Sequence, residues 1–187
     1  MLRPTQLNSI VRRVQDLAFA PCDTVAHRVK ETMTTKPHVT IRQASIFDID
    51  AVAPLFDAYR QFYRKPSDLT AATQFLLDRV RNGDSIVLTA NTDDDGVVGF
   101  AQVYFSFSSV SMARVLILND LFVVPEARHV GIGTRLLEEV VSIGKKMEAV
   151  RITLSTEANN VVAQALYKGK GWKEQTDFRV YNLSLSK

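Results

Sequence analysis

The sequence predicts a single domain of the α/β (α+β) class, in which helices flank a mixed central β-sheet. Three observations support this prediction: β-branched runs alternate with stretches of helical spacing, turn and capping residues separate them, and no segment repeats. A chain of 187 residues that is 46% apolar and 23% charged has the composition of an ordinary globular protein with one core.

The domain is predicted to span residues 37–187, and its elements begin with a strand at residue 38. In chain order the predicted elements are a strand at 38–42, helices at 49–59 and 69–80, strands at 85–90, 97–107 and 115–124, a helix at 131–147, a strand at 150–155, a helix at 161–168, and strands at 172–176 and 178–185. Each assignment rests on a period of two or of 3.6 residues in its apolar side chains.

Local signals justify the elements of the first half. Ser45, with Asp48 three residues later, resembles a helix start with an acid in its first turn. Pro66 separates the first two helices, and Asn82-Gly83 ends the second. Asp93-Asp94-Asp95-Gly96 predicts a hairpin turn, because Asp-Gly is a frequent hairpin signal. These aspartates lack the glutamate that closes an EF-hand loop, so calcium is not expected.

The second half begins with a nearly continuous apolar run from Val115 to Val124, which predicts a strand buried on both faces. Asn119 and Asp120 interrupt this run. They indicate either a bulge or opening beside a site, or polar groups that are satisfied within the core. Pro125 ends the strand, and helical spacing predicts the two helices that follow.

Residues 1–36 differ from the rest and are predicted to form an N-terminal extension that is flexible or leader-like. Several arginines and a short amphipathic run at 7–17 are typical of an organelle leader, whereas Asp16, Asp23 and Glu31 are not. A tail outside the domain, or a misassigned start with Met33 as the first residue, are the other interpretations. The sequence leaves the three open.

The composition argues against several kinds of function. The formal net charge is only +3 and the basic residues form no dense run, so no nucleic-acid partner is expected. No apolar run approaches the roughly 18 residues of a membrane helix, so no membrane is expected. Cys22 is the sole cysteine, which excludes an internal disulfide and a zinc site of paired cysteines. No metal is expected, and a cytoplasmic location is predicted.

The segment after the strand at 115–124 carries the clearest chemical signal. Two glycines, Gly131 and Gly133, stand at the start of a helix, where unpaired N–H groups and the helix dipole favour an anion. Arg128 adds a cation beside them. The Rossmann fingerprint needs a third glycine and the P-loop needs a lysine, and both are missing here. The pattern therefore predicts a phosphate cradle of another type.

Three blocks of sequence resemble the signatures of the GNAT acetyltransferases, and they occur in that family's order. The blocks are Asp120-Leu121-Phe122-Val123, Arg128-x-x-Gly131-x-Gly133, and Asn160-x-x-Ala163-x-x-Leu166-Tyr167 followed by Gly171-Trp172. The resemblance covers about residues 39–185. It implies a GNAT-like domain with a splayed cofactor cleft, and it implies acetyl-CoA as the cosubstrate.

The resemblance also implies roles for individual residues. The main chain of the strand would pair with the pantetheine arm, the loop amides would hold the pyrophosphate, and a later asparagine would touch the cofactor. The cofactor-binding residues implied are Phe122, Val123, Val124, Arg128, His129, Val130, Gly131, Ile132, Gly133, Thr134 and Asn160. The side chain of His129 is expected to play no catalytic part.

Two catalytic residues are expected from the same resemblance. Tyr167 would face the thioester sulfur and protonate the leaving thiolate. The base is open: Asn119 stands where diamine acetyltransferases of the family carry glutamate, so Asp120 or an ordered water chain would have to substitute. Asp120 could equally be a structural acceptor. Transfer is expected to be direct, with an amide near Phe122 holding the oxyanion.

The acceptor is predicted to be a primary amine of a small molecule, a polyamine or an amino acid. The segment 107–112 resembles polyamine-type members of the family, and 59–63 either lines a pocket or belongs to the core. A protein lysine or N-terminus is the second interpretation, and a CoA-binding sensor without turnover is the third. A homodimer is compatible with the sequence but not indicated by it.

Overall fold

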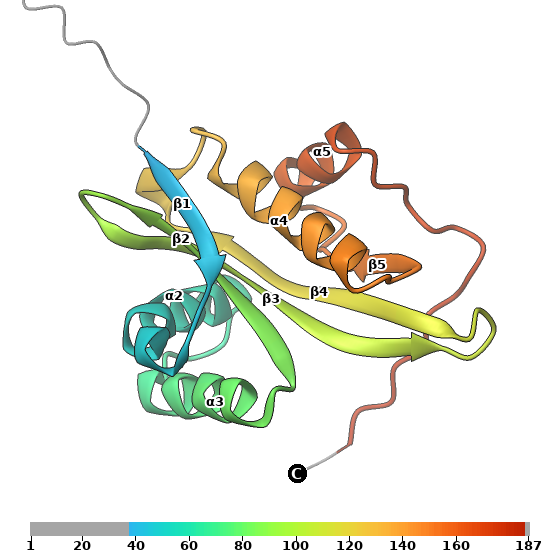
Figure 1. Ribbon diagram of the computed structural model, residues 1–187, viewed down its shortest axis with the longest axis horizontal. Helices are drawn as coiled ribbons and strands as arrows, with labels where there is room; N and C mark the ends of the chain where they lie inside the picture. Colours follow the sequence, from blue (N-terminus) through green and yellow to red (C-terminus); the bar gives the residue numbers. More distant parts are fainter. Residues whose placement is uncertain (1–37, 186–187) are drawn as a thin grey trace, which may run out of the picture. The chain divides into compact units, whose positions relative to one another are not determined.

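The computed structural model describes residues 38–185, so the predictions for residues 1–36 lie outside the described residues. Within that range the strands form one sheet in the order β1-β2-β3-β4-β5 (Figure 1). The elements are β1 (Val39–Gln43), η1 (Ile46–Asp48), α2 (Ile49–Phe62), α3 (Leu69–Asn82), β2 (Ser85–Thr92), β3 (Gly96–Ser108), β4 (Ala113–Val123), η2 (Pro125–Ala127), α4 (Ile132–Lys146), β5 (Arg151–Leu154) and α5 (Val161–Gly169).

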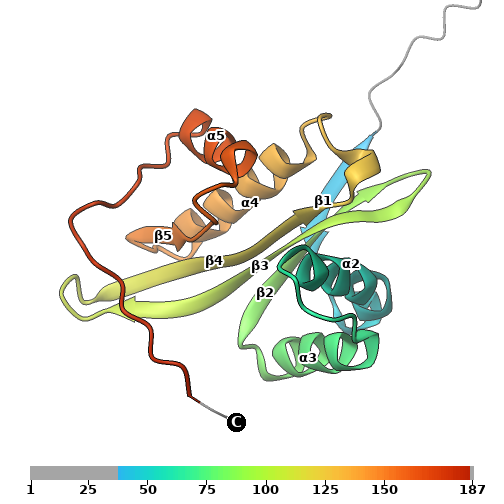
Figure 2. The same cartoon turned by 180° about the vertical axis from the view of Figure 1, so that it is seen from behind.

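The sheet is mixed, as predicted. β1 to β4 pair with their neighbours in antiparallel fashion, whereas β4 and β5 are parallel. Helices α2 and α3 cover one face of the sheet, and α4 and α5 lie on the other (Figures 1 and 2). The α/β domain with a helix-flanked mixed sheet is therefore confirmed.

Each face of the sheet has its own apolar core. On the α4 side, Leu88, Val103 and Leu136 are buried among one set of side chains. On the side of α2 and α3, Ile49 and Phe100 belong to the other set. Burial of each such side chain contributes about 1.5–3 kcal/mol, so the two clusters hold the helices against the strands that carry the site.

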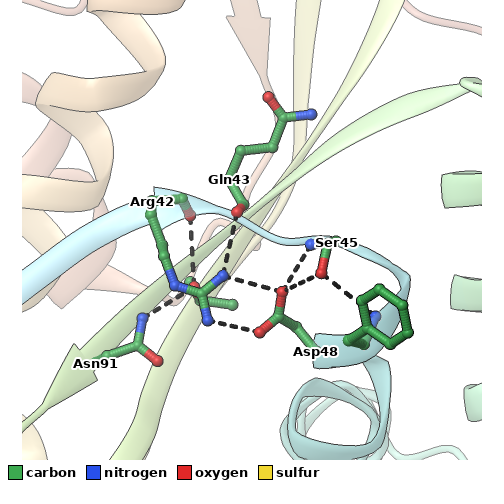
Figure 3. Close-up of polar contacts among 7 residues, drawn as sticks. Arg42, Gln43, Ser45, Asp48 and Asn91 are labelled. Atoms are coloured by element: carbon green, nitrogen blue, oxygen red, sulfur yellow. Dashed lines mark hydrogen bonds and ion pairs between the residues drawn. The ribbon is translucent and has the colours of Figure 1, made fainter.

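A polar cluster joins β1 to the start of α2 (Figure 3). The Arg42 guanidinium donates to both carboxylate oxygens of Asp48, and Asp48 Oδ2 also accepts from the Ser45 amide at 2.7 Å and from its hydroxyl at 2.8 Å. The hydrogen bond from Arg42, followed by those from Ser45, holds the pKa of Asp48 well below its usual range. The helix start predicted from Ser45 and Asp48 is confirmed, with the short turn η1 leading into α2.

Within the stretch that pairs with β3, β4 contains one residue more than the strand opposite it. Its pairing with β3 shifts so that Asp120 lies opposite Gln102 and Asn119 is left over as a bulge. Leu118 packs in the α4 core while Asp120 meets α2, although strict alternation would put both on one face. Parallel pairing with β5 ends at Leu118 and Leu154, just before the bulge. The predicted bulge at this interruption is confirmed.

Residues 170–185, the part of the chain after α5 that the structure describes, carry no strand, so the strands predicted at 172–176 and 178–185 are wrong. The prediction rested on alternating aromatic and β-branched residues. However, Phe178, Val180 and Tyr181 are 74%, 83% and 84% exposed, and no neighbouring strand pairs with them. Local propensity alone does not make a strand, because a strand also needs a hydrogen-bonded partner and a face to pack.

Candidate active site

A cavity of about 600 Å³ opens beyond the end of β5, where β4 continues without a parallel partner. β4 continues from Asn119 to Val123 without β5 beside it, so the main chain on this edge is unpaired by the sheet. The lining residues are Tyr59, Phe62, Tyr63, Leu118, Asn119, Leu121, Phe122, Val123, Ala127, Arg128, His129, Gly131, Ile132, Gly133, Thr134, Ser155, Thr156, Asn160, Val162, Ala163, Leu166 and Tyr167. The walls are thus β4, the β4–α4 loop, α5 and the end of α2.

The loop from β4 to α4 turns tightly before the helix begins. His129 has φ 66° and Gly131 has φ 90°, both in the left-handed region. A residue with a Cβ incurs about 1–2 kcal/mol there, whereas glycine does not. α4 then begins at Ile132, and its first turn lines the cavity. The N–H groups of that turn have no partner within the helix and favour an anion.

The two glycines of the loop serve different purposes. A Cβ on Gly131 would meet no atom within 4 Å, so this glycine is needed for its backbone conformation and leaves space beside the loop. A Cβ on Gly133 would lie 3.5 Å from the Leu166 side chain, which places α4 close to α5. The open space at Gly131 fits a loop that a phosphate group can approach closely.

Arg128 is held against the strand that precedes it. Its Nε donates to the Val123 carbonyl at 2.8 Å, and its guanidinium carbon lies 5.6 Å from the centroid of the Phe122 ring. The side chain lines the cavity and is exposed to solvent. A fixed guanidinium at the cavity wall can pair with a phosphate oxygen.

α5 brings Asn160 and Tyr167 to the same cavity. The Asn160 side-chain oxygen accepts from the Ala163 amide at 3.2 Å, so the residue caps the helix as well as lining the site. Tyr167 is half-buried, with its ring centroid 6.1 Å from that of Trp172. Burial, then the proximity of Tyr63, raises the pKa of Tyr167. Tyr167 is therefore neutral at pH 7 and carries a proton.

Asp120 is only 4% exposed and lies behind the cavity wall, outside the lining. The Asn119 amide nitrogen donates to its two oxygens at 3.1 and 3.2 Å. The Tyr59 hydroxyl lies against the same carboxylate and donates to the Asn119 carbonyl at 3.3 Å. Burial raises the pKa of Asp120, and the hydrogen bonds from Asn119 and Tyr59 oppose this rise.

The end of α2 forms an aromatic wall. Tyr59, Phe62 and Tyr63 line the cavity, with ring centroids 5.0 Å apart for Tyr59 and Tyr63 and 5.1 Å apart for Phe62 and Tyr63. Tyr59 also packs edge-on against Phe100 and Phe122 of the core. The segment 59–63 therefore fulfils both predictions made for it, as pocket wall and as core. Aromatic faces attract ammonium groups.

A family model described as the acetyltransferase (GNAT) family matches residues 50–172. The chain belongs to the GNAT family of acetyltransferases. The predicted family and its N-acetyltransferase reaction, which takes the acetyl group from acetyl-CoA, are confirmed.

Individual relatives of this GNAT acetyltransferase agree. The uncharacterized N-acetyltransferase YhfO of Bacillus subtilis is 46% identical over 147 residues, which are 79% of this chain and 98% of that protein. The thialysine N-epsilon-acetyltransferase of Bos taurus is 31% identical over 93 residues, 49% of this chain and 54% of that protein. A crystal structure described as a probable acetyltransferase is 38% identical with a TM-score of 0.75, covering 79% of this chain and 99% of that one.

In this acetyltransferase the cavity unites most of the predicted site residues, but Val124, Val130 and Asp120 do not line it. Val124 and Val130 line a second hollow of about 390 Å³. The Val124 amide donates to the Val98 carbonyl at 3.0 Å, so it pairs with β3 and is not free for the cosubstrate. The residues of the implied set that line the cavity are Phe122, Val123, Arg128, His129, Gly131, Ile132, Gly133, Thr134, Asn160 and Tyr167.

In this GNAT enzyme, the part of the cavity wall that follows β5 was not predicted from the sequence. Ser155 and Thr156 directly follow β5 and line the cavity. Ligands of α/β proteins bind beyond the carboxyl ends of parallel strands. The position of Ser155 and Thr156, directly after a parallel strand, was therefore a signal that could have predicted them as site residues. Leu166 lines the cavity beside Tyr167, and its packing against Gly133 could not be inferred from spacing.

The charges of the site are few. Among the lining residues Arg128 is the one with a permanent charge, and none of them is a carboxylate. Within residues 38–185 no group of three or more His, Cys, Asp or Glu side chains is placed to bind a metal ion. In the same part of the chain, no helix has the length and apolar character that a bilayer crossing requires.

Proposed function

We propose that this acetyltransferase moves the acetyl group of acetyl-CoA to the primary amine of a small molecule, such as an amino acid or a polyamine. The observation that carries the proposal is one cavity lined both by the start of α4 with Arg128 and by the aromatic wall of α2. Its volume of about 600 Å³ falls in the range of small-molecule sites, roughly 300–1,000 Å³.

The start of α4 with Arg128 suits the anionic part of acetyl-CoA. The first turn of α4 offers free N–H groups, Arg128 offers a fixed cation, and Gly131 leaves open space beside the loop. The edge of β4 from Asn119 to Val123 is free of β5, so the amides of the pantetheine arm could pair with it as an added strand. This arrangement would direct the thioester toward α5 and α2.

The aromatic wall suits a cationic acceptor. Tyr59, Phe62 and Tyr63 present rings to the cavity, and such rings attract an ammonium group before it loses its proton. The Bos taurus relative is named for thialysine, an amino acid with a primary amine on its side chain. That name supports an acceptor of similar size and charge.

The chemistry follows from the groups around the cavity. The neutral amine attacks the thioester carbonyl carbon, the new C–N bond forms, and the C–S bond breaks. Tyr167, which holds its proton at pH 7, gives it to the departing sulfur. A main-chain amide of β4 near Phe122 would hold the negative oxygen formed during attack.

The proposal is tested by acetyl-CoA consumption over a panel of acceptors. The panel contains thialysine, spermidine, L- and D-amino acids, and a peptide with one lysine and a free N-terminus. We expect turnover with the small amines and little with the peptide. Turnover with the peptide alone would indicate a protein acetyltransferase. Tight CoA binding with no turnover on any acceptor would indicate a sensor, and either result contradicts the proposal.

A further inference from the structure

We infer that the hydroxyl of Tyr59 carries the acceptor's proton from the cavity to the buried carboxylate of Asp120. The inference rests on the proposed function, because it concerns an amine that arrives protonated. A lysine-like amine has a pKa of about 10.4, so nearly all of it is an ammonium ion at pH 7. Its nitrogen can attack only after one proton has left, and some group must receive that proton.

None of the described residues that line the cavity offers a carboxylate for this task. A carboxylate adjoins the lining at Asp120, which is 4% exposed and lies behind Asn119 and Tyr59. Tyr59 is the titratable residue that belongs to both places. Its ring lines the cavity, and its hydroxyl lies against the Asp120 carboxylate and 3.3 Å from the Asn119 carbonyl.

The surroundings of Asp120 are suited to a group that gains and loses a proton. The Asn119 amide donates to both of its oxygens when it is ionised. The Tyr59 hydroxyl, which donates to the adjacent Asn119 carbonyl, is close enough to Asp120 to turn and donate to it instead. Gln102 lies directly opposite in the pairing of β3 with β4, and its buried Oε1 has no hydrogen-bond partner among the described residues. A protonated Asp120 would supply the donor that this oxygen lacks, so each state of the carboxyl group has a neighbour to match it.

A second tyrosine near Asp120 provides a comparison. Tyr104 extends from β3, and burial, followed by the charge of Asp120, raises its pKa to about 12. Arg79 at the end of α3 lowers that pKa and Asp84 before β2 raises it. Tyr104 does not line the cavity. It therefore shares the neighbourhood of Asp120 with Tyr59 but cannot meet the acceptor.

The transfer can be written with every proton accounted for. The ammonium ion gives a proton to the Tyr59 oxygen while the Tyr59 hydroxyl proton passes to Asp120, so tyrosine ends unchanged. The amine then attacks, the C–S bond breaks with its electron pair on sulfur, and Tyr167 protonates the sulfur. The second proton of the nitrogen restores Tyr167. After product release, Asp120 returns its proton through Tyr59 to solvent.

The test compares Tyr59→Phe, Asp120→Asn and Tyr104→Phe with the wild type, in kcat/KM for thialysine or the best acceptor of the panel. At pH 7 we expect Tyr59→Phe and Asp120→Asn to lose roughly 10²–10⁴ in rate, the usual value of acid–base catalysis. The deficit should shrink toward pH 10, because the amine then arrives without its proton. The Tyr104→Phe enzyme should keep the rate and the pH profile of the wild type.

If the role of Tyr59 were only structural, Tyr59→Phe would lose the same factor in kcat/KM at every pH and would melt at a lower temperature. That result, or a fully active Tyr59→Phe enzyme, overturns the inference and leaves the proposed function standing. A wild type inactive on every amine overturns both. A readout without turnover is carbon-13 NMR of the Asp120 carboxyl group, whose pKa should rise in Tyr59→Phe, since a donor is lost, and stay in Tyr104→Phe.

Discussion

At the scale of single residues, the loop before α4 depends on the backbone of Gly131. With φ at 90°, any side chain there is strained, and its Cβ would project into space that is open in the structure. We expect Gly131→Val to reduce CoA affinity by about 5- to 150-fold, because keeping the loop in its binding conformation would then cost about 1–3 kcal/mol of strain. Calorimetric titration with CoA measures the effect.

Gly83 offers a matched control for this change. It caps α3 with φ 65°, and a Cβ there would also meet no atom within 4 Å. Gly83→Val should lower the melting temperature about as much as Gly131→Val does. Its affinity for CoA should stay as in the wild type. If the Gly131 variant binds CoA as well as the Gly83 variant does, the loop is not the phosphate cradle.

Tyr167 is the residue we propose as the proton donor to sulfur. Tyr167→Phe removes one oxygen and keeps the ring beside Trp172, so the fold should survive. We expect kcat to fall by roughly 10²–10⁴ while CoA affinity changes little, as measured by steady-state kinetics and calorimetry.

The control for that variant is Tyr181→Phe, which removes a hydroxyl from a tyrosine that is 84% exposed and far along the chain from the cavity-lining residues. It should behave as the wild type does in every assay. A Tyr167→Phe enzyme with normal kcat, or one that merely melts earlier, would refute the assignment.

At the scale of elements, α2 is tied to the start of α3 by a buried carboxylate. Asp57 is 5% exposed and accepts from the Ser67 hydroxyl at 2.6 Å, the Asp68 amide at 2.9 Å, Gln61 at 2.9 Å and Arg60 at 3.1 Å. The bond from the Asp68 amide, then that from Ser67, lowers the pKa of Asp57. These hydrogen bonds hold α2, the helix that carries the aromatic wall, against the start of α3.

Asp57→Asn replaces one acceptor oxygen by a donor and leaves buried N–H or O–H groups without partners. We expect a loss of about 1–3 kcal/mol in the free energy of unfolding, measured by urea titration at pH 7. Asp94→Asn, in the exposed hairpin turn, is the control and should cost far less.

The difference in the free energy of unfolding between the wild type and Asp57→Asn should depend on pH with a definite sign. Because the pKa of Asp57 is lower in the folded protein than in the unfolded chain, its stabilisation is complete above the unfolded value of about 3.9. It is lost as the pH falls through the folded value. The gap between wild type and Asp57→Asn should therefore hold from pH 7 to about pH 4 and narrow below that. A gap that widens in acid would contradict this account.

The elements that sequence could predict are those whose signals lie within them. α2, α4 and the turn at 93–96 carry their own periodicity, caps or turn residues, and they formed where expected. The strands expected at 172–176 and 178–185 did not, because pairing depends on another part of the sheet. The glycine loop and Tyr167 could likewise be predicted, because each lies in a contiguous motif. The position of Asp120 behind Tyr59 could not, because it depends on how α2 packs across β4.

At the scale of the whole molecule, the predicted division at residue 36 can be tested by truncation. All described helices and strands begin at Val39 or later, and the Bacillus subtilis relative is matched over 98% of its length by 79% of this chain. A chain that starts at Met33 should therefore fold, melt at the temperature of the full chain and keep its kcat. A loss of soluble protein would show that the domain needs the preceding residues.

The bulge at Asn119 has a consequence for how this molecule can be altered. The strand is one residue too long for its neighbour, and the opening beside β5 begins at that surplus residue. Deleting Asn119 would restore a regular ladder without moving Asp120 or Phe122 to the other face, so the shortened chain should still fold. With β4 straight, Ser155 and Thr156, which follow β5, could continue the parallel pairing beyond Leu118 and close the cavity. The length of this strand, more than the identity of its side chains, would separate a catalyst from an inert scaffold of the same fold.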